Sequence, residues 1–386
     1  MNNSGARVNT SVAMVNNSRT MVNSMGKQGF GGTRGIAWLI ALTLVLTVTS
    51  GAFGTAARAD DLPVTSDIPP AGTKIRVMVY NGAYTSLPVF VAKDMGFYAK
   101  YHLDPEQTVV ASGPAGVAAL LGGSLDFIEP PTDQIIENQV HGSDLRIVVG
   151  NEVRNFFDLV ASSKLKLPHE AAGYPAIMQD LKGLRIGVNA LGASTHLMMN
   201  ALLKGAGMTP DDVTYVADGS SNTALAAWQA DRVDAQMAFT PFPEIIQALG
   251  SGRSIINISA GQGPALLQKL GGAFEDWSCK ASYIREHPDI VNAFIKAHVD
   301  TIAWIKHPAN RPKLTDLIGK YVNTSIIPED KRAQTVALMI DNYNQYFGTT
   351  VDRGAIDAWN QYLLDNKLIP HAVAAADVIY AGAPKP

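Results

Sequence analysis

The chain has 386 residues, a formal net charge of −3, one cysteine and 47% apolar residues. At roughly 100–200 residues per domain, this length indicates two or three domains with ample material for a core. The near balance of 31 basic and 34 acidic residues argues against nucleic acid as a partner, and the lone Cys279 excludes an intramolecular disulfide, a multi-cysteine zinc site and an iron–sulfur cluster.

Residues 1–59 have the pattern of a signal peptide for export. They carry five basic residues and no acidic one, and residues 36–48 form an almost uninterrupted apolar run. Ala57 and Ala59 then supply the small side chains of a cleavage site. An N-terminal anchor helix is the alternative, although the apolar run is short for a membrane span. A start at Met25 would give a signal of ordinary length.

The mature chain from Asp60 would hold 26 basic and 34 acidic residues, a net charge of −8. We expect it to be soluble and exported, most simply to the periplasm, and to act as a monomer. Residues 60–73 contain three prolines and predict an extended lead-in.

Residues 75–258 alternate short apolar segments with helical patterns of about ten residues, which predicts βαβ units and a mostly parallel sheet. Strands are expected first at 75–79, 107–111, 125–128, 145–149 and 158–162, and helices at 89–101, 115–121 and 134–140. The pattern then restarts, with strands at 184–188, 213–216, 233–239 and 255–258 and helices at 194–205 and 223–229. From residue 283 the pattern is chiefly helical. The predicted domains are a first part of lobe 1 at 74–160, lobe 2 at 161–258, and a return to lobe 1 at 259–386.

Three places share one design, in which a strand ends, a turn rich in Ser, Thr and Gly follows, and a helix begins. They are Ala111-Ser112-Gly113-Pro114, Gly192-Ala193-Ser194-Thr195 and Asp218-Gly219-Ser220-Ser221. At each, a hydroxyl can cap the helix while backbone N–H groups point into the crevice beyond the strand ends. Because a helix N-terminus carries roughly half a positive charge, two facing ends make an anion site without Arg or Lys. Each turn taken singly is also compatible with an ordinary capped helix.

Several further segments follow one another in order over residues 74–258. They are Leu87-Pro88-Val89-Phe90 with Gly96-Phe97-Tyr98, Gly122-Gly123-Ser124-Leu125-Asp126, Asp180-Leu181-Lys182-Gly183, Gly192-Ala193-Ser194-Thr195-His196 and Arg232-Val233-Asp234-Ala235. In this order and spacing the chain resembles the nitrate/sulfonate/taurine-type (thiamine-pyrimidine-precursor-binding-like) substrate-binding proteins of ABC importers.

The resemblance implies an α/β chain with the type II periplasmic-binding-protein fold, in which two α/β lobes joined by two crossover strands hold a ligand between them. It also implies that an anionic group is bound through backbone N–H groups and hydroxyls, which agrees with the helix-terminus argument. Carried over by position, the candidate ligand-binding residues are Tyr84, Ser86, Ser112, Gly113, Glu129, Thr132, Ser194, Thr195, His196, Asp218, Thr240 and Phe242.

Two departures from the family pattern bear on the ligand. Glu129 and Asp133 stand where many relatives have small or neutral residues. A carboxylate facing the cleft would repel a simple anion and favour an ammonium or a hydrogen-bonding ring, whereas Asp133 is also suited to capping the helix that follows it. Aromatic candidates are plentiful, and we expect Tyr84 and Phe242 to line the site and the others to be core.

The sequence favours binding over catalysis. His196 is the histidine in a candidate turn, and it lacks a nucleophile motif with a third orienting group. We expect no catalytic residue, no cofactor and no metal. The histidines are scattered along the sequence, and Cys279 is expected to be a buried, unreactive thiol. A thiamine-pyrimidine synthase of the same fold is the enzyme alternative, but it carries a cysteine cluster that this chain lacks.

The resulting hypothesis is an exported protein that captures a small organic anion or zwitterion, such as a sulfonate or taurine, for an ABC permease and its ATPase. Nitrate, an aromatic carboxylate and a thiamine-type pyrimidine stay open as ligands. The alternative role is a binding subunit for a sensor or another uptake system.

Overall fold

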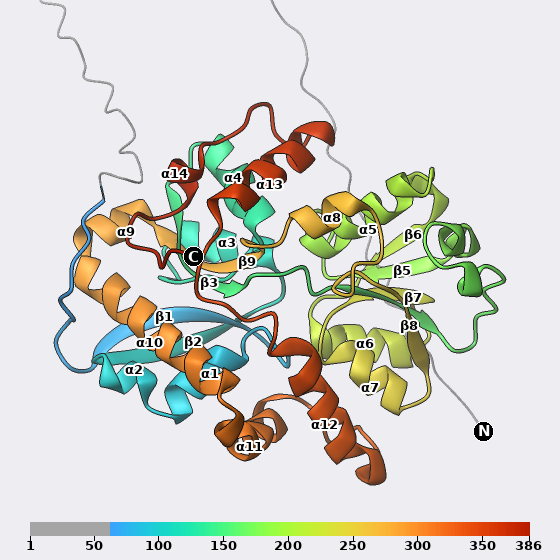
Figure 1. Cartoon of the computed structure of the whole chain (residues 1–386), viewed down its shortest axis with the longest axis horizontal. Coiled ribbons are helices and arrows are strands. Elements are labelled where there is room, and N and C mark those ends of the chain that lie inside the picture. The colour runs from blue at the N-terminus through green and yellow to red at the C-terminus, as the bar shows by residue number, and fades with distance from the viewer. Residues whose placement is uncertain (1–61) are drawn as a thin grey trace, which may run out of the picture. The chain divides into compact units, whose positions relative to one another are not determined.

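The computed structural model describes residues 62–386, and the expected export signal lies outside the described residues. The described chain forms two lobes in which helices pack on sheets (Figure 1). Lobe 1 contains the sheet built around β1, and lobe 2 contains the sheet built around β5. Two crossover segments, residues 153–157 and 258–274, connect them.

Lobe 1 draws its strands from both ends of the described chain. β1 pairs in parallel with β2, β9 pairs antiparallel with β3, and single bridges at Phe127 and Ile128 join the two pairs. The elements before the first crossover are β1 (Thr73–Tyr80), α1 (Leu87–Asp94), α2 (Phe97–Lys100), β2 (Leu103–Val110), α3 (Gly113–Leu121), α4 (Thr132–Val140) and β3 (Leu145–Glu152).

Lobe 2 holds a sheet in the order β6-β5-β7-β4-β8, with β4 antiparallel to both neighbours. Its elements are β4 (Asp158–Ser162), β5 (Arg185–Val188), α5 (Ser194–Gly205), β6 (Thr214–Ala217), α6 (Ser221–Gln229), β7 (Ala235–Ala238), α7 (Phe242–Ala248) and β8 (Gly252–Asn257). The strands of lobe 1 have the same spatial order as those of lobe 2. In lobe 1, β9 enters from the other lobe and lies between the Phe127–Ile128 segment and β3, just as β4 lies between β7 and β8 in lobe 2. The expected boundary at residue 160 therefore falls inside a strand of lobe 2.

An arginine–aspartate pair occurs at the same place in both lobes, and it gives a structural role to the aspartate that precedes each third strand. Asp126 accepts a 2.8 Å hydrogen bond from the backbone N–H of Arg76 and binds its guanidinium. Asp234 accepts a 2.8 Å bond from the N–H of Arg185 and two from its guanidinium, at 2.9 and 2.7 Å. Each aspartate thus ties the start of the third strand to the first strand, where the ladder would otherwise end.

Two expected elements differ from the observed ones. The helix expected at 89–101 is divided into α1 and α2 because Gly96 takes a left-handed conformation with φ of 78°. The third strand of lobe 1, expected at 125–128, is reduced to the single bridges of Phe127 and Ile128. The helix expected at 194–205 has the bounds of α5.

The C-terminal helices contact both lobes, although the sequence pattern predicted a return to lobe 1 alone. α10 packs on α1 and α2, whereas α12 packs on α7 of lobe 2, where Asn342 donates a 3.1 Å hydrogen bond to Glu244. Tyr362 donates a 2.8 Å bond to the carbonyl of Leu197 in α5. The elements after the second lobe are α8 (Ala265–Lys269), β9 (Glu275–Lys280), α9 (Ala281–Glu286), α10 (Pro288–Lys306), α11 (Arg311–Tyr321), α12 (Glu329–Tyr343), α13 (Arg353–Asp365) and α14 (Ala375–Val378).

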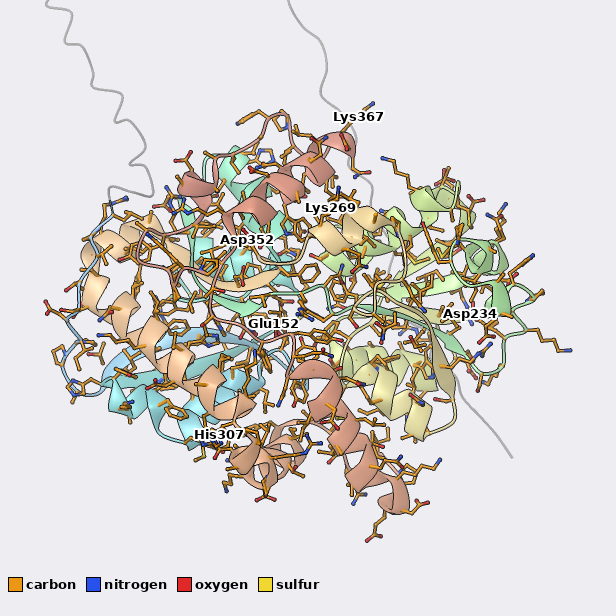
Figure 2. All side chains as sticks on the ribbon, in the orientation of Figure 1. Glu152, Asp234, Lys269, His307, Asp352 and Lys367 are labelled. Carbon is orange, nitrogen blue, oxygen red and sulfur yellow. The ribbon has the colours of Figure 1, made fainter. Side chains whose placement is uncertain are left out.

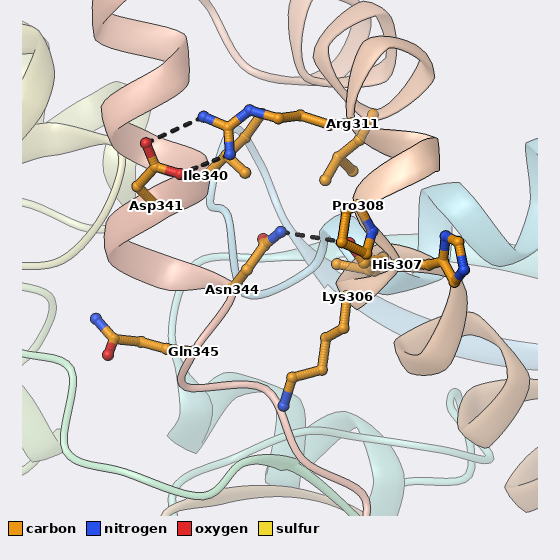
Figure 3. A pocket seen from close by; sticks show the side chains of 10 residues that line it. Lys306, His307, Pro308, Arg311, Ile340, Asp341, Asn344 and Gln345 are labelled. Carbon is orange, nitrogen blue, oxygen red and sulfur yellow. Dashed lines mark hydrogen bonds and ion pairs between the residues drawn. The ribbon is translucent and has the colours of Figure 1, made fainter.

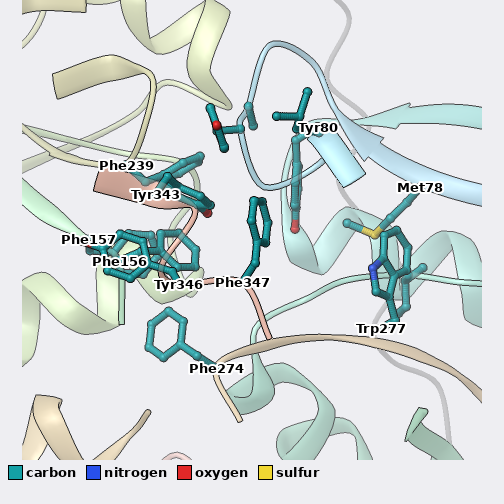
Figure 4. Close-up of a cluster of buried hydrophobic side chains, with 14 of the residues drawn as sticks. Met78, Tyr80, Phe156, Phe157, Phe239, Phe274, Trp277, Tyr343, Tyr346 and Phe347 are labelled. Carbon is teal, nitrogen blue, oxygen red and sulfur yellow. The ribbon is translucent and has the colours of Figure 1, made fainter. Parts of the chain in front are cut away.

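Aromatic side chains from every part of the fold gather where the lobes join (Figure 4). Phe156 and Phe157 come from the first crossover, Phe239 from lobe 2, Phe274 from the second crossover and Tyr343 from α12. Phe157 lies 5.6 Å from Phe274 and 5.8 Å from Phe239 between ring centroids. Within residues 62–386, none of the helices combines the length and the apolar character that a bilayer crossing requires.

Candidate ligand-binding site

A narrow cavity lies between the lobes. About 20 Å³ is left in it for the centres of water molecules, which is room for roughly one water. Its walls combine strand ends, helix starts and one residue of the second crossover. The lining residues are Tyr80, Gly113, Pro131, Gln134, Phe157, Asn189, Ala193, Ser194, Thr195, Phe239 and Glu275.

The topology places these residues together. Tyr80 ends β1, Asn189 follows β5 and Phe239 follows β7, so the carboxyl ends of parallel strands in both lobes face the cavity. Gly113 starts α3 and Ser194 starts α5, which brings the N-termini of two helices to the same space. The first backbone N–H groups of each helix have no partner within the helix and carry its positive end.

The turn before α5 is organised differently from the expected capped helix. The Ser194 hydroxyl donates a 2.7 Å hydrogen bond to the Asp133 carboxylate at the start of α4, on the other lobe. The Thr195 hydroxyl accepts a 3.0 Å bond from the N–H of Asn189 and so fixes the end of β5. No side-chain cap forms at α3, α5 or α6, the three helices of the described chain for which the sequence predicted one.

A second bond also joins the lobes. The backbone N–H of Tyr84 donates to the carbonyl of Thr240 at 3.3 Å. Together with the Ser194–Asp133 bond it holds the lobes in contact on two sides of the cavity, so the described conformation is the closed one.

A network of buried carboxylates lies behind the lobe 1 wall. The Ser86 hydroxyl accepts from the N–H of Tyr80 at 2.8 Å and donates to Glu129 at 2.6 Å. The Asn151 amide donates to Glu129 at 2.9 Å and to Glu152 at 2.6 Å. Burial raises the pKa of both glutamates well above the usual range, since a charged carboxylate loses its hydration there. Figure 2 shows Glu152 near the junction of the lobes, far from the exposed Lys367.

Glu275 is the acidic residue of this group that lines the cavity. It begins β9, is 4% exposed, and its carboxylate shares a hydrogen bond with the Tyr80 side chain. Burial, followed by the charges of Glu152 and Glu129, raises its pKa. The neighbouring Asp276 is also buried, and its carboxylate accepts a 3.1 Å bond from the N–H of Asn151.

Of the candidate residues, Gly113, Ser194 and Thr195 line the cavity. Tyr84, Ser86, Glu129 and Thr132 are fully buried beside it, and Ser112 is the N-terminal flanking residue of α3. The Thr240 hydroxyl donates to Glu244 at 3.0 Å.

Besides Thr240, three candidates in lobe 2 lie outside the lining set. His196 accepts a 3.1 Å bond from the N–H of Gly192 and packs on Tyr215 in its own lobe. Asp218 accepts from Gln236 at 3.2 Å, and burial raises its pKa to about 7. Phe242 is buried against Trp228. The expectation that Asp133 caps α4 is wrong, because the residue lies in the first turn and bonds Ser194 instead.

The sequence reasoning missed most of the aromatic and polar lining. Phe157 and Phe239 line the cavity, whereas the preferred aromatics Tyr84 and Phe242 are buried and absent from its lining. Tyr80, Asn189 and Phe239 carried a usable signal, since each stands at the carboxyl end of an expected strand. Glu275 carried none, because it comes from a crossing strand that enters the sheet from a distant part of the chain.

A larger hollow lies away from the lobe junction, between the end of α10 and helices α11 and α12 (Figure 3). Arg311 and Asp341 form an ion pair there at 2.5 Å, and Asn344 donates a 3.4 Å bond to the carbonyl of Ile305. It is lined by the C-terminal helices and the turns that connect them.

Other chemistries find little support in the described residues. Residues 62–386 contain no group of three His, Cys, Asp or Glu side chains arranged to hold a metal ion. Cys279 is fully buried, and this burial raises the pKa of its thiol, which disfavours the reactive thiolate.

Comparison with known proteins places the chain in a family. The NMT1-like family matches over residues 74–319. A protein of Brucella abortus (strain 2308), named as a binding protein, is 32% identical over 153 residues, which are 39% of this chain and 43% of the relative's length. The match therefore spans less than half of that relative.

Two solved structures are similar in fold. The alkanesulfonate-binding protein SsuA from Xanthomonas axonopodis pv. citri, bound to MOPS, has a TM-score of 0.64 and 20% identity over 80% of this chain and 99% of its own. The periplasmic nitrate-binding protein NrtA from Synechocystis PCC 6803 has a TM-score of 0.53 and 15% identity over 79% of this chain and 93% of its own. These similarities confirm the expected periplasmic-binding-protein fold.

Proposed function

The chain belongs to the NMT1-like family, and we propose that it is an exported solute-binding protein that captures a small organic solute between its lobes and delivers it to an ABC permease. The observation that carries the proposal is the interlobe cavity, where the starts of α3 and α5 meet the ends of strands from both lobes. Ligand held there would contact both lobes and shift the population toward the closed form, which the permease would recognise.

The names of the structural relatives support this role. They are alkanesulfonate-binding and nitrate-binding proteins, and the second is named as periplasmic. We propose the periplasm as the location, with residues 1–59 as the cleaved signal, and the permease and its ATPase as partners of a monomer. Within the class of organic anions and zwitterions, sulfonates and taurine are the first candidates.

Binding groups that are already ordered would increase the affinity for the ligand. The helix starts and the Thr195 hydroxyl are held by backbone structure before ligand arrives, so little ordering has to accompany binding. We propose that the protein catalyses no reaction, since the buried Cys279 and the self-contained contacts of His196 offer no nucleophile and base in the cavity.

A thermal-shift panel on the purified protein tests the proposal, using sulfonates, taurine, nitrate, aromatic carboxylates and pyrimidines. A ligand at 100 times its dissociation constant adds about 2.7 kcal/mol to the free energy of unfolding, which raises the melting temperature measurably. A shift that is lost when Gly113 or Ser194 is changed supports the interlobe site. A shift that survives both changes would place binding elsewhere.

A further inference from the structure

The side chains that line the cavity are acidic or neutral, which is not expected of a site for a simple anion. Among the lining residues of the described chain, Glu275 carries a formal charge and no lysine, arginine or histidine is present. A small anion in this cavity would therefore face an acidic side chain and, among the described residues that line it, no cationic one.

The side chains around Glu275 are acidic or neutral. Glu129 and Glu152 are fully buried, and their hydrogen-bond partners are the neutral side chains of Ser86, Asn151 and Tyr343. Asp276, beside Glu275 in the chain, bonds a backbone N–H. Without a cationic partner, burial favours the protonated form of these carboxyl groups, whereas a positive group bound beside Glu275 would allow its carboxylate to ionise and pair with it.

A second, independent feature points to a ligand at the same place. Gln134 lines the cavity and is 3% exposed, yet neither its amide nitrogen nor its oxygen has a hydrogen-bond partner. The amide lies directly over Gly113, where a Cβ atom would stand 2.4 Å from its oxygen. A buried amide that bonds nothing loses its hydrogen bonds to water without replacement, and a polar ligand would restore them.

We propose that the ligand carries a protonated nitrogen, as an ammonium or amidinium group, which pairs with Glu275 while the Gln134 amide bonds an adjacent polar group. The inference rests on the proposed function, because it concerns the same interlobe site. The N-terminus of α3 would receive an anionic group of the same molecule, so the ligand is a zwitterion rather than nitrate or a simple alkanesulfonate.

The first test is native mass spectrometry of the purified protein with taurine, isethionate, benzamidinium and benzoate, each added separately. Binding of taurine or benzamidinium in preference to its partner supports the inference. Binding of isethionate or benzoate alone overturns it and leaves the proposed function standing. Protein that binds none of the four would contradict both the inference and the proposed function for these ligand classes.

Matched probes and a variant assign the role to Glu275. Taurine and isethionate share a sulfonate and differ in an ammonium against a hydroxyl, and benzamidinium and benzoate differ in charge on one ring. Stronger stabilisation by isethionate or benzoate than by its partner would count against the inference. Glu275→Gln should weaken the binding of taurine or benzamidinium at least tenfold, whereas Glu286→Gln, on the exposed end of α9, should leave the same Kd unchanged. Equal Kd values for the two variants would remove Glu275 from the site.

Discussion

The Ser194 hydroxyl of lobe 2 donates a 2.7 Å hydrogen bond to the Asp133 carboxylate of lobe 1, across the interlobe cavity. Asp133 is fully buried and its second oxygen has no partner, so this bond is the contact that compensates its burial in part. An anion of the protein thus occupies the start of α5, a position at which a bound anion would otherwise be stabilised. The bond therefore contributes to the contact between the lobes.

We predict that Ser194→Ala opens the unliganded protein. Loss of one hydrogen bond to a carboxylate costs about 1.5 kcal/mol, which corresponds to roughly a tenfold shift in the ratio of open to closed molecules. Fluorescence energy transfer between dyes on introduced cysteines at the exposed positions Lys93 and Lys166 measures this ratio, and the buried Cys279 should stay unlabelled. Ser325→Ala on the surface is the control. Identical transfer in both variants would show that the bond does not hold the lobes together.

We predict that Gly113→Ala weakens ligand binding at least tenfold while the fold is kept. The new methyl group would stand 2.4–2.9 Å from the Gln134 amide, and this flexible side chain would have to move into the cavity. The helix tolerates alanine well, because Gly113 starts α3 and its φ is not positive. Calorimetric titration and thermal melting separate binding from folding. Gly319→Ala in α11, where a Cβ meets nothing within 4 Å, should change neither.

We predict that the protein is less stable at pH 8.5 than at pH 6.5. Burial raises the pKa of Asp133, Glu137 and Asp218 to about 7 and that of Asp158 to about 8. The folded state then holds protons that the unfolded state has released, so the stability these groups contribute is complete below pH 4 and is lost as the pH rises through 7 to 8. Melting temperatures in matched buffers measure the slope.

Asp158→Asn tests the origin of this slope. Asp158 has a buried carboxylate oxygen without a partner, and an amide there carries no charge at any of these pH values. The variant should therefore melt about 2 °C or more higher than the parent at pH 8.5 and show a flatter profile. His298 acts in the opposite sense, since burial lowers its pKa to about 3, and it opposes the slope only weakly because its unfolded form is already half deprotonated at pH 6.5. A steeper profile in the variant would refute this explanation.

We predict that Asp126→Ala destabilises lobe 1 by about 2–4 kcal/mol. The change removes the acceptor of the Arg76 backbone N–H and of its guanidinium, and leaves that N–H unpaired at the strand end. Denaturant unfolding followed by fluorescence gives the free energy. Asp104→Ala, on the exposed side of β2, should stay within about 0.5 kcal/mol of the parent. A small effect of Asp126→Ala would mean that the paired motif in the two lobes has another purpose.

Much of the fold follows from local pattern. The alternation of apolar strands and helices predicted two α/β lobes, and α5 has the predicted bounds because its apolar periodicity and its start signal coincide. The helix after β1 was predicted as one piece and is two, since the left-handed Gly96 ends α1. The third strand of lobe 1 was predicted at its full length but is reduced to single bridges. One of these bridges joins Ile128 to Ser278, some 150 residues away, and a local sequence pattern cannot predict such a pairing.

The site divides in the same way. Local sequence predicted that Gly113, Ser194 and Thr195 stand at the starts of helices that follow strands, and parallel topology brings such ends together. Contacts between distant segments bring Glu275 and Gln134 into the cavity lining and join Asp133 to Ser194 beside it. The reason is physical: a strand or helix start is encoded by neighbouring residues, whereas burial, loss of hydration and contact between lobes depend on segments far apart in the chain.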